Sequence, residues 1–313
     1  MFRFRVLGGF ALESPAGEVV PLAQRRAEAF LAILAVCGDL GCTRERLMAL
    51  LWPDGDEHHS RHDLRNVLHI IRRSLGKDAV VSRADGLYLN SSVLRSDVHD
   101  FTGSITTGAL RDAVSQYSGP LLDGFHVDGA PDFERWLDAE RARLGRQYEE
   151  ALGRLAADAE RSEQWDDAVL WWRRLVEHDP SNSRLVLRCA QATYATGDRV
   201  NALKALDAHV RWMRGEMDLE PVPEVLLEIQ RMRRSEEPDL EPDRRRVAGI
   251  EGTPPERPAA DMQPVEIEAS RPAPAWPAVG PLPRRWPRWS KWAVLDVIAG
   301  AAAALTQIGR AHV

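Results

Sequence analysis

The sequence predicts a mainly α-helical protein with a small β component, and the hydrophobic pattern carries this prediction. Apolar residues recur at the spacing of one helix face over most of residues 21–75 and 100–234. Alternation with a period of two, which is typical of strands, is confined to residues 2–20 and to the neighbourhood of residues 80–89. From residue 235 the chain becomes rich in proline, which disfavours both kinds of element.

The first elements are predicted to be a small hairpin followed by three helices. Residues 2–20 form the hairpin, with Val19-Val20 as its returning strand. The three helices are expected at residues 21–37, 43–52 and 61–75. The residues expected to begin or cap them are, in order, Pro21, Thr43 and Ser60.

A second hairpin is predicted directly after the third helix. Asp85-Gly86, a strong signal for a tight hairpin turn, separates the apolar runs Val80-Val81 and Leu87–Leu89. Strands, three helices and a hairpin, in this order, are the elements of a winged helix-turn-helix domain. In that architecture the third helix enters the major groove of DNA, and the hairpin is the wing.

The third predicted helix has an apolar stripe opposite a polar and basic face. The stripe consists of Leu64, Val67, Leu68, Ile71 and Leu75. The residues predicted to contact DNA are His62, Arg65, Asn66, His69, Arg72, Arg73, Lys77 and Arg83. Arginine suits a guanine edge and asparagine an adenine edge, whereas the cations near the helix end suit phosphates, and Arg83 suits an adjacent minor groove or the backbone. A solvated face whose basic end offsets the helix dipole is the alternative interpretation.

Residues 97–234 are predicted to form a second, helical domain. Residues 132–159 are expected to form one long amphipathic helix, and residues 121–125 a connecting loop. Glu163–Leu170 aligns with Gly197–Lys204 at an offset of 34 residues, which is the period of tetratricopeptide helix pairs. We therefore predict that this domain is tetratricopeptide-like.

The C-terminal quarter is predicted to contain a linker and the start of a membrane helix. Residues 235–288 hold twelve of the twenty prolines, so we expect a disordered, extended linker. Residues 289–308 follow a basic, tryptophan-rich stretch typical of the cytoplasmic edge of a membrane helix, although their apolar run is shorter than a full span. The final residues, Ile308–Val313, match one reading frame of a common sequencing adapter. We therefore expect the natural protein to continue beyond them, with a tether to the inner membrane.

Charge and cysteine content indicate which cellular compartment and which kinds of partner suit the chain. The net charge is −6, with +2 over residues 1–96 and −10 over residues 97–240, so the chain as a whole is not a generic polycation. The N-terminus lacks a secretory signal. Cys37, Cys42 and Cys189 show neither disulfide nor metal-ligand spacing and are expected to be small apolar side chains in a reducing cytoplasm.

No catalytic or cofactor-binding pattern is found, so we expect neither an enzyme nor a cofactor. A phosphate-binding loop and a metalloprotease motif are both missing from the sequence. His58-His59 with His62 suggests metal ligands, but adjacent histidines rarely point at one ion and no further ligand completes a site. Asp54 and Asp56 lie in a polar loop where nothing would shift their pKa for acid–base work.

Several motifs follow one another in a fixed order along residues 2–234. They are Val6–Phe10, Leu50–Asp54, Leu64–Gly76, Gly119–Phe125, Phe133–Leu137 and Glu140-Arg141. In this order they resemble the Streptomyces antibiotic regulatory protein family. The resemblance implies an OmpR-type winged-helix DNA-binding domain over residues 1–96 and a bacterial transcriptional activation domain over residues 97–234.

The resemblance also implies partners and a mode of action. Such a protein activates transcription without a phosphorelay, binds double-stranded DNA, often as one of two copies on direct repeats, and approaches RNA polymerase through a loop at residues 52–60. The helical domain would mediate self-association, as a homodimer, or regulation. The sequence shows neither a receiver domain nor an ATPase domain, and its linker and membrane approach are similar to those of ToxR-like one-component regulators.

Two functions are compatible with this pattern. The first is a sequence-specific transcriptional regulator, an activator, that reads the promoter major groove with the helix at residues 61–75. The second is a tetratricopeptide-like protein–protein adaptor whose winged helix does not read DNA. The face of the third helix discriminates between them, because an adaptor need not keep Arg65, Asn66 and His69 opposite a clean apolar stripe.

Overall fold

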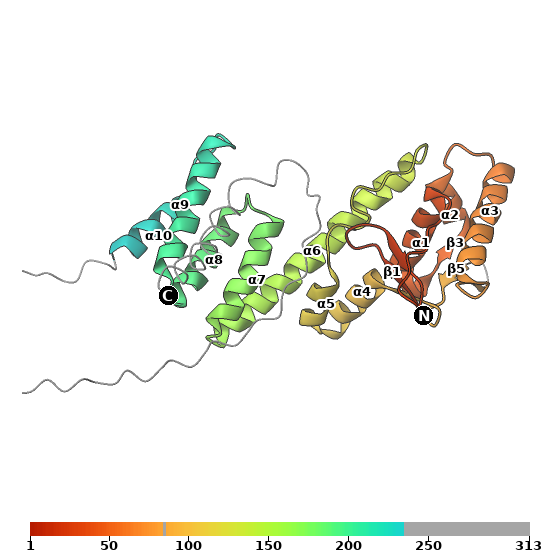
Figure 1. Ribbon diagram of the computed structural model, residues 1–313. Coiled ribbons are helices and arrows are strands. Elements are labelled where there is room, and N and C mark those ends of the chain that lie inside the picture. The colour runs from red at the N-terminus through yellow and green to blue at the C-terminus, as the bar shows by residue number, and fades with distance from the viewer. Residues whose placement is uncertain (84–85, 235–313) are drawn as a thin grey trace, which may run out of the picture. The chain divides into compact units, whose positions relative to one another are not determined.

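The computed structural model describes residues 1–83 and 86–234, and they form a mainly helical structure with a small β component, as predicted (Figure 1). Residues 1–209 belong to one compact unit, and the chain from residue 210 belongs to a second. The predicted linker at residues 235–288 and the predicted membrane approach at residues 289–308 lie outside the described residues. Within the described part, no helix is long and apolar enough to cross a bilayer.

The N-terminal sheet joins the start of the chain to a strand that lies more than eighty residues later. Its members are β1 (Phe2–Arg5), β2 (Ala11–Glu13) and β6 (Leu94–Ser96). β1 pairs antiparallel with β2 and parallel with β6, and buried Phe4 lies opposite buried Leu12. The returning strand predicted at Val19-Val20 is reduced to a single bridge between Glu13 and Val19. The bridge is flanked by two backbone hydrogen bonds of 2.8 Å, from the Ser14 N–H to the Glu18 carbonyl and from the Val20 N–H to the Leu12 carbonyl. Val19 is exposed, whereas Val20 packs against the core.

Three helices follow in the predicted order. They are α1 (Arg25–Cys37), α2 (Arg44–Leu51) and α3 (Glu57–Leu75). The predicted start of the first helix at Pro21 is wrong, because Gln24 has extended backbone angles and helical geometry begins only after it. The predicted cap of the second helix is confirmed: the Thr43 hydroxyl accepts a hydrogen bond from the backbone N–H of Arg46 at 3.2 Å.

The third helix begins four residues earlier than residue 61, so its prediction as 61–75 is corrected to 57–75. Asp56, and not Ser60, is the N-cap, and its carboxylate accepts a hydrogen bond from the His59 N–H at 2.8 Å. Ser60 is buried inside the first turns of the helix. The polar residues around Asp56 suggested a loop because a capping residue is itself polar.

A small sheet lies beside α3. Its strands are β3 (Cys42–Thr43), β4 (Val80–Arg83) and β5 (Gly86–Leu89), in the order β3-β5-β4. The hairpin predicted from Asp85-Gly86 is present, with Val81 opposite Tyr88 and Arg83 opposite Gly86. The Tyr88 ring packs onto Gly41, which has a φ of +64° and where any Cβ would collide with that ring. Gly41 therefore permits the turn that brings β3 into the sheet.

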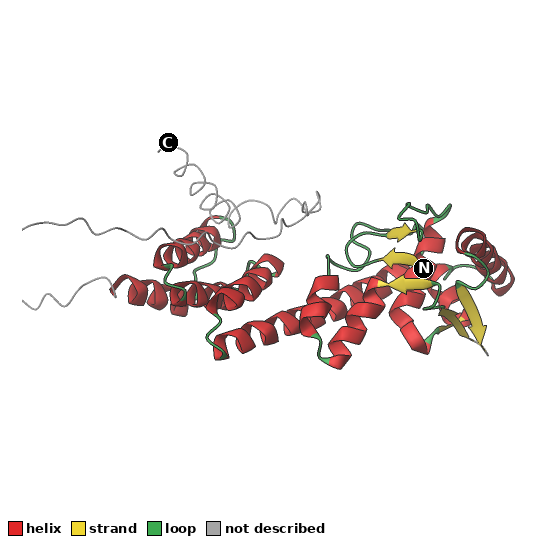
Figure 2. Ribbon diagram, turned by 60° about the horizontal axis from the view of Figure 1, so that its bottom comes forward, coloured by secondary structure: helices red, strands yellow, loops and turns green. Residues whose placement is uncertain are grey.

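Helices make up the rest of the described chain, whereas the strands are confined to its first hundred residues (Figure 2). The helices are α4 (Asp97–Thr107), α5 (Leu110–Gln116), α6 (Pro131–Arg161), α7 (Trp165–His178), α8 (Ser183–Ala195), α9 (Arg199–Gly215) and α10 (Pro223–Arg234). The expected loop at residues 121–125 and the long helix near 132–159 are both confirmed. α7 begins at Trp165 and α9 at Arg199, an offset of 34 residues, and Ala168 and Ala202 are both fully buried. The tetratricopeptide interpretation remains a prediction.

The end of β1 is bonded to the loop between α5 and α6. Leu7 and Leu121 form a bridge, the Gly8 N–H donates to the Pro120 carbonyl at 2.9 Å, and the Leu122 N–H donates to the Val6 carbonyl at 2.7 Å. All four leucine and valine side chains at these positions are buried. α6 packs against α5 and α7 and, in addition, against α2. The first hundred residues and the helices that follow thus share one core within the unit of residues 1–209.

A buried carboxylate makes a second connection. Asp97, the first residue of α4, accepts hydrogen bonds from the backbone N–H groups of Val6 at 2.9 Å, Leu7 at 2.9 Å and Val98 at 2.7 Å. Burial raises the pKa of this carboxyl, and the backbone hydrogen bonds partly oppose that shift. Asp97 therefore ties the end of β1 to the start of α4.

Candidate nucleic-acid interface

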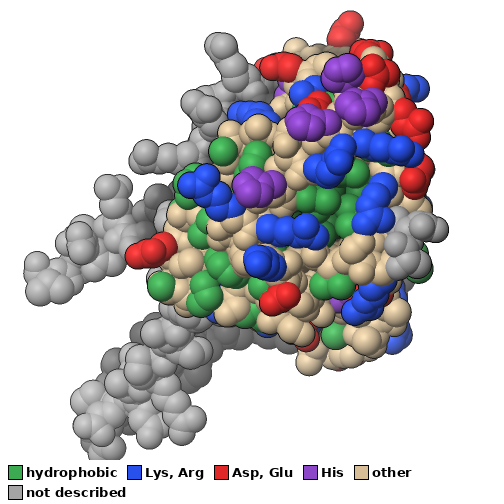
Figure 3. Space-filling model, turned by 90° about the vertical axis from the view of Figure 1, so that its right-hand side faces the viewer, with side chains coloured by type: hydrophobic (Ala, Val, Ile, Leu, Met, Phe, Trp, Pro, Cys, Tyr) green, Lys and Arg blue, Asp and Glu red, His purple; other side chains and the backbone are tan. Residues whose placement is uncertain are grey.

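Six of the eight residues predicted to contact DNA lie on the face of α3 that points away from the core, whereas Lys77 follows the helix and Arg83 ends β4. The side chains of Leu64, Val67, Ile71 and Leu75 are buried, as the predicted stripe requires. Every one of the eight predicted contact residues is exposed, namely His62, Arg65, Asn66, His69, Arg72, Arg73, Lys77 and Arg83. Figure 3 views the molecule from the side on which α3 lies in Figure 1, and it shows arginine, lysine and histidine side chains spread over this face.

Charge is distributed unevenly along α3. In its first turns Arg61 pairs with Glu57 at 2.5 Å, and His59 lies 2.7 Å from a carboxylate oxygen of Asp56. Among the described residues, no carboxylate lies within ion-pair distance of Arg72, Arg73 or Lys77. The beginning of α3 is therefore internally neutralised, and its end leaves positive charge available to an anion.

Arg65 lies midway along the exposed face. Its Nε donates a hydrogen bond to the backbone carbonyl of Arg61 at 3.1 Å, which holds the side chain along the preceding turn. This bond uses one of the five guanidinium donors. The remaining donors are those that a guanine edge would accept.

Two further arginines contact the small sheet, Arg83 at the end of β4 and Arg44 from the start of α2. The Arg83 guanidinium lies 5.6 Å from the centre of the Tyr88 ring. Arg44, in the first turn of α2, donates to the Ser82 hydroxyl at 2.5 Å and so lies against β4. Sequence reasoning did not select Arg44; its only signal was a cation in the first turn of a helix, where the helix dipole disfavours it.

The histidines at the start of α3 are not gathered around one point. His58 and His59 meet edge to face with ring centres 5.9 Å apart, and His59 is engaged by Asp56. In the part of the chain that the structure describes, no three histidine, cysteine or carboxylate side chains are placed to hold a metal ion.

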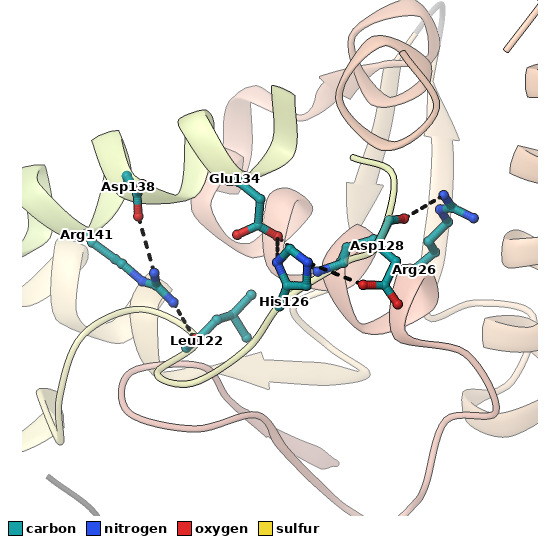
Figure 4. A network of polar contacts seen from close by, with 8 residues as sticks. Arg26, Leu122, His126, Asp128, Glu134, Asp138 and Arg141 are labelled. Carbon is teal, nitrogen blue, oxygen red and sulfur yellow. Dashed lines mark hydrogen bonds and ion pairs between the residues drawn. The ribbon is translucent and has the colours of Figure 1, made fainter. Parts of the chain in front are cut away.

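A network of polar contacts connects the start of α6 and its preceding loop with α1 (Figure 4). Glu134 accepts from the Val127 N–H at 2.9 Å and lies 2.9 Å from the His126 ring. The Arg26 guanidinium donates to the Asp128 carbonyl at 3.0 Å. The segment after residue 125 is thereby held against the first turn of α1.

Arg141 anchors the same loop from further along α6. Its guanidinium donates to the carbonyls of Leu121 at 2.8 Å and Leu122 at 2.6 Å (Figure 4). Leu122 has a φ of +48°, a conformation uncommon for a side chain of this type. Two hydrogen bonds from one guanidinium help to hold this backbone, and they fix how α6 meets the strand end at Leu7.

Two comparisons bear on this architecture. Residues 100–233 match the family model of the bacterial transcriptional activator domain. The match covers the helices from α4 to α10 almost completely, and it supports the resemblance to the Streptomyces antibiotic regulatory protein family. We refer to these residues below as the activator-domain match.

The fold has a counterpart among solved structures. The chain is similar to EmbR of Mycobacterium tuberculosis, solved in complex with a low-affinity phosphopeptide, with a TM-score of 0.52 and 17% sequence identity. The similarity covers 76% of this chain and 66% of the EmbR chain, so the chain spans about two thirds of that protein. At this identity the likeness concerns the fold. No curated protein matches the chain significantly in sequence.

Proposed function

We propose that the protein is a transcriptional activator of the Streptomyces antibiotic regulatory protein type, with an OmpR-type winged helix that reads DNA. One observation carries the proposal: the activator-domain match at residues 100–233 is joined to a helix, α3, whose exposed face is basic at its C-terminal half. A protein–protein adaptor would not require cations without ion-pair partners, such as Arg72, Arg73 and Lys77, at the end of α3. A promoter supplies the phosphates and base edges that such a face fits.

In this proposal α3 lies in the major groove. Arg65 and Asn66 contact base edges, and Arg72, Arg73 and Lys77 contact phosphates on the flanking backbone. Arg83 in the hairpin β4–β5, the wing, reaches the adjacent minor groove or backbone. The protein would act without a cofactor, and its chemistry would be binding.

The same proposal assigns surfaces to the protein partners. The loop between α2 and α3 spans residues 52–56 and includes exposed Asp54 and Asp56, and it would approach RNA polymerase. Residues 100–233 would mediate self-association, so that two copies of the protein occupy direct repeats of DNA, or would receive a regulatory signal. These assignments come from the family resemblance.

The test is DNA binding by the full chain to the sequence upstream of its own gene, measured by gel shift against excess nonspecific competitor. The proposal expects specific retardation that Arg65→Ala weakens. If the upstream DNA fails, selection from random duplexes is the second arm. Failure to enrich any motif there would refute DNA reading and favour the adaptor.

Base-reading variants are expected to change sequence preference. Arg65→Ala or Asn66→Ala removes hydrogen bonds to one base pair, so each should cost about 1–3 kcal/mol of binding free energy on the preferred site and less on other sites. The measurement is the ratio of dissociation constants for the selected site and for single-base variants. An equal loss on every sequence would contradict the base-reading role.

Phosphate-contact variants are expected to behave differently. Arg73→Ala or Lys77→Ala should weaken binding to all duplexes alike. Each should also make the slope of log K against log salt shallower by about 0.9 for every phosphate that is no longer neutralised. Titrations at several salt concentrations on specific and nonspecific DNA measure both effects. A selective loss on the preferred site alone would show that the two roles are assigned the wrong way round.

A further inference from the structure

Two of the three cysteines lie on either side of one tight turn. Cys37 is the last residue of α1, and Cys42 begins β3. Gly38, with a φ of +53°, and Gly41, with a φ of +64°, reverse the chain between them, and such backbone angles favour glycine. The Gly41 N–H donates to the Gly38 carbonyl at 3.1 Å, which closes the turn. The turn therefore brings together two cysteines whose spacing in the sequence did not suggest a pair.

The side chains of these two cysteines are in direct contact. The Cys42 thiol donates a hydrogen bond to the Cys37 sulfur, and both residues are free thiols. Cys42 is buried, whereas Cys37 is partly exposed. Among the described residues, no third histidine, cysteine or carboxylate joins them in a cluster that could hold a metal ion. The chemistry open to the pair is therefore that of two neighbouring thiols.

The contact makes one of the two thiols the better nucleophile. The hydrogen bond from Cys42 lowers the pKa of Cys37, and the charge of Arg46 adds to this effect, while burial and the Glu140 carboxylate oppose it. The same hydrogen bond, together with burial, raises the pKa of Cys42. Attack on a disulfide requires a thiolate that the reagent can reach. Cys37, which is partly exposed and has the lowered pKa, meets both conditions.

The third cysteine lacks these features. Cys189 lies in α8, and burial raises its pKa to about 11. Its thiol therefore stays protonated near neutral pH. It provides an internal control for any oxidation of the pair.

We propose that Cys37 and Cys42 form a reversible disulfide by exchange with a low-molecular-weight disulfide. The Cys37 thiolate attacks one sulfur of the reagent, which breaks the small disulfide, releases the first small thiolate and leaves a mixed disulfide on Cys37. Cys42 then gives its proton to water, and its sulfur attacks the Cys37 sulfur and releases the second small thiolate. The protons lost by the two protein thiols end on the two small thiols. The protein pair is oxidised, and the small disulfide is reduced.

The turn has room for this bond to form. The two sulfur atoms must move from hydrogen-bond contact to a bond length of about 2.0 Å. Leu40, at the tip of the turn, is 90% exposed, so the turn can shift without loss of core packing. The bond would join the end of α1 to β3, and so to the sheet that also holds β5 and β4. The inference is independent of the proposed function, because it concerns only the chemistry of the two thiols.

The experiment uses the full chain, with oxidised glutathione as the small disulfide. After incubation the free thiols are alkylated and the protein is digested with trypsin, which leaves Cys37 and Cys42 on one peptide, residues 27–44. We expect mass spectrometry to find this peptide without alkylation and lighter by two hydrogen atoms, with Cys189 alkylated. Excess reduced glutathione is expected to restore alkylation of both cysteines.

Variants test the order of the two steps. Cys42→Ala removes the second nucleophile, so the reaction should stop at a glutathione adduct on Cys37. Cys37→Ala removes the first nucleophile and should leave Cys42 unmodified. Cys189→Ala is the matched control, and it should form the internal disulfide as the wild type does.

The peptide map of the wild type decides the proposal, so a variant that fails to fold does not affect the test. Alkylation of both Cys37 and Cys42 after incubation would overturn it, because the pair would then resist exchange. A glutathione adduct that persists on Cys37 would overturn it as well, since Cys42 would then be unable to complete the reaction. A disulfide to Cys189 or between two chains in place of the internal one would also exclude the pair.

Discussion

Replacement of Asp97 by alanine is expected to destabilise the unit of residues 1–209 by on the order of 3 kcal/mol. The carboxylate accepts hydrogen bonds from Val6, Leu7 and Val98, and all three residues are buried. Removal of the acceptor leaves buried N–H groups without partners, each of which costs about 1–3 kcal/mol. Urea unfolding followed by circular dichroism measures the change. Asp100→Ala is the control, because Asp100 lies one turn further along α4 and pairs with half-exposed Arg95, a kind of contact worth about 1 kcal/mol or less.

The pH dependence of stability tests the state of the same carboxyl. Burial raises the pKa of Asp97 above 3.8 in the folded protein. Between 3.8 and the folded pKa, the native state binds more protons than the unfolded state, so the contribution of Asp97 to stability falls as pH rises through this window. Asp97→Asn cannot titrate. The free-energy advantage of the wild type over Asp97→Asn should therefore shrink from about pH 4 upward, and an advantage that grows with pH would show that the hydrogen bonds outweigh burial.

The order of elements was predictable from the sequence because local signals determine it. Each predicted helix of the first 96 residues is present, and the Asp85-Gly86 hairpin has its strands in register up to Arg83 and Gly86. The buried stripe of α3 follows directly from a period of 3.6 residues. These signals lie within a few residues of the element they specify, so no knowledge of the rest of the fold was needed.

The boundaries of helices were less predictable, since several polar residues compete for each cap. Ser60 and Asp56 are both good N-cap residues. The structure selects Asp56, because this choice buries Ser60 and extends α3 by one turn. The pairing of β1 with β6 was invisible for another reason: it joins residues more than eighty positions apart, and a three-residue strand such as Leu94–Ser96 carries too little pattern.

The candidate DNA-binding surface could be predicted only where one helix face defines it. The eight selected residues are all exposed, and their roles in DNA binding remain predictions.

The contact between Leu7 and Leu121 is expected to contribute much of the stability of the junction between the end of β1 and residues 100–233. Both side chains are almost completely buried, and their backbones form a bridge. Leu121→Ala should destabilise residues 1–209 by about 2–5 kcal/mol, the range for a leucine removed from a packed core. Leu227→Ala is the control, because this exposed leucine lies outside that unit and should change stability by less than about 0.5 kcal/mol.

A double-mutant cycle separates this contact from a general loss of core volume. Leu7→Ala and Leu121→Ala should show a coupling free energy of about 0.5–3 kcal/mol, because each removes the partner of the other. Additive effects would show that other contacts stabilise the connection. Arg141, which bonds the carbonyls of Leu121 and Leu122, is then the next residue to vary.

The same substitution also bears on function. If the loop positions α6 against the strand end, then in Leu121→Ala the first hundred residues should unfold at a different urea concentration from α6 and α7. DNA binding by the α3 face should survive that separation, because none of its predicted contacts lies in the loop.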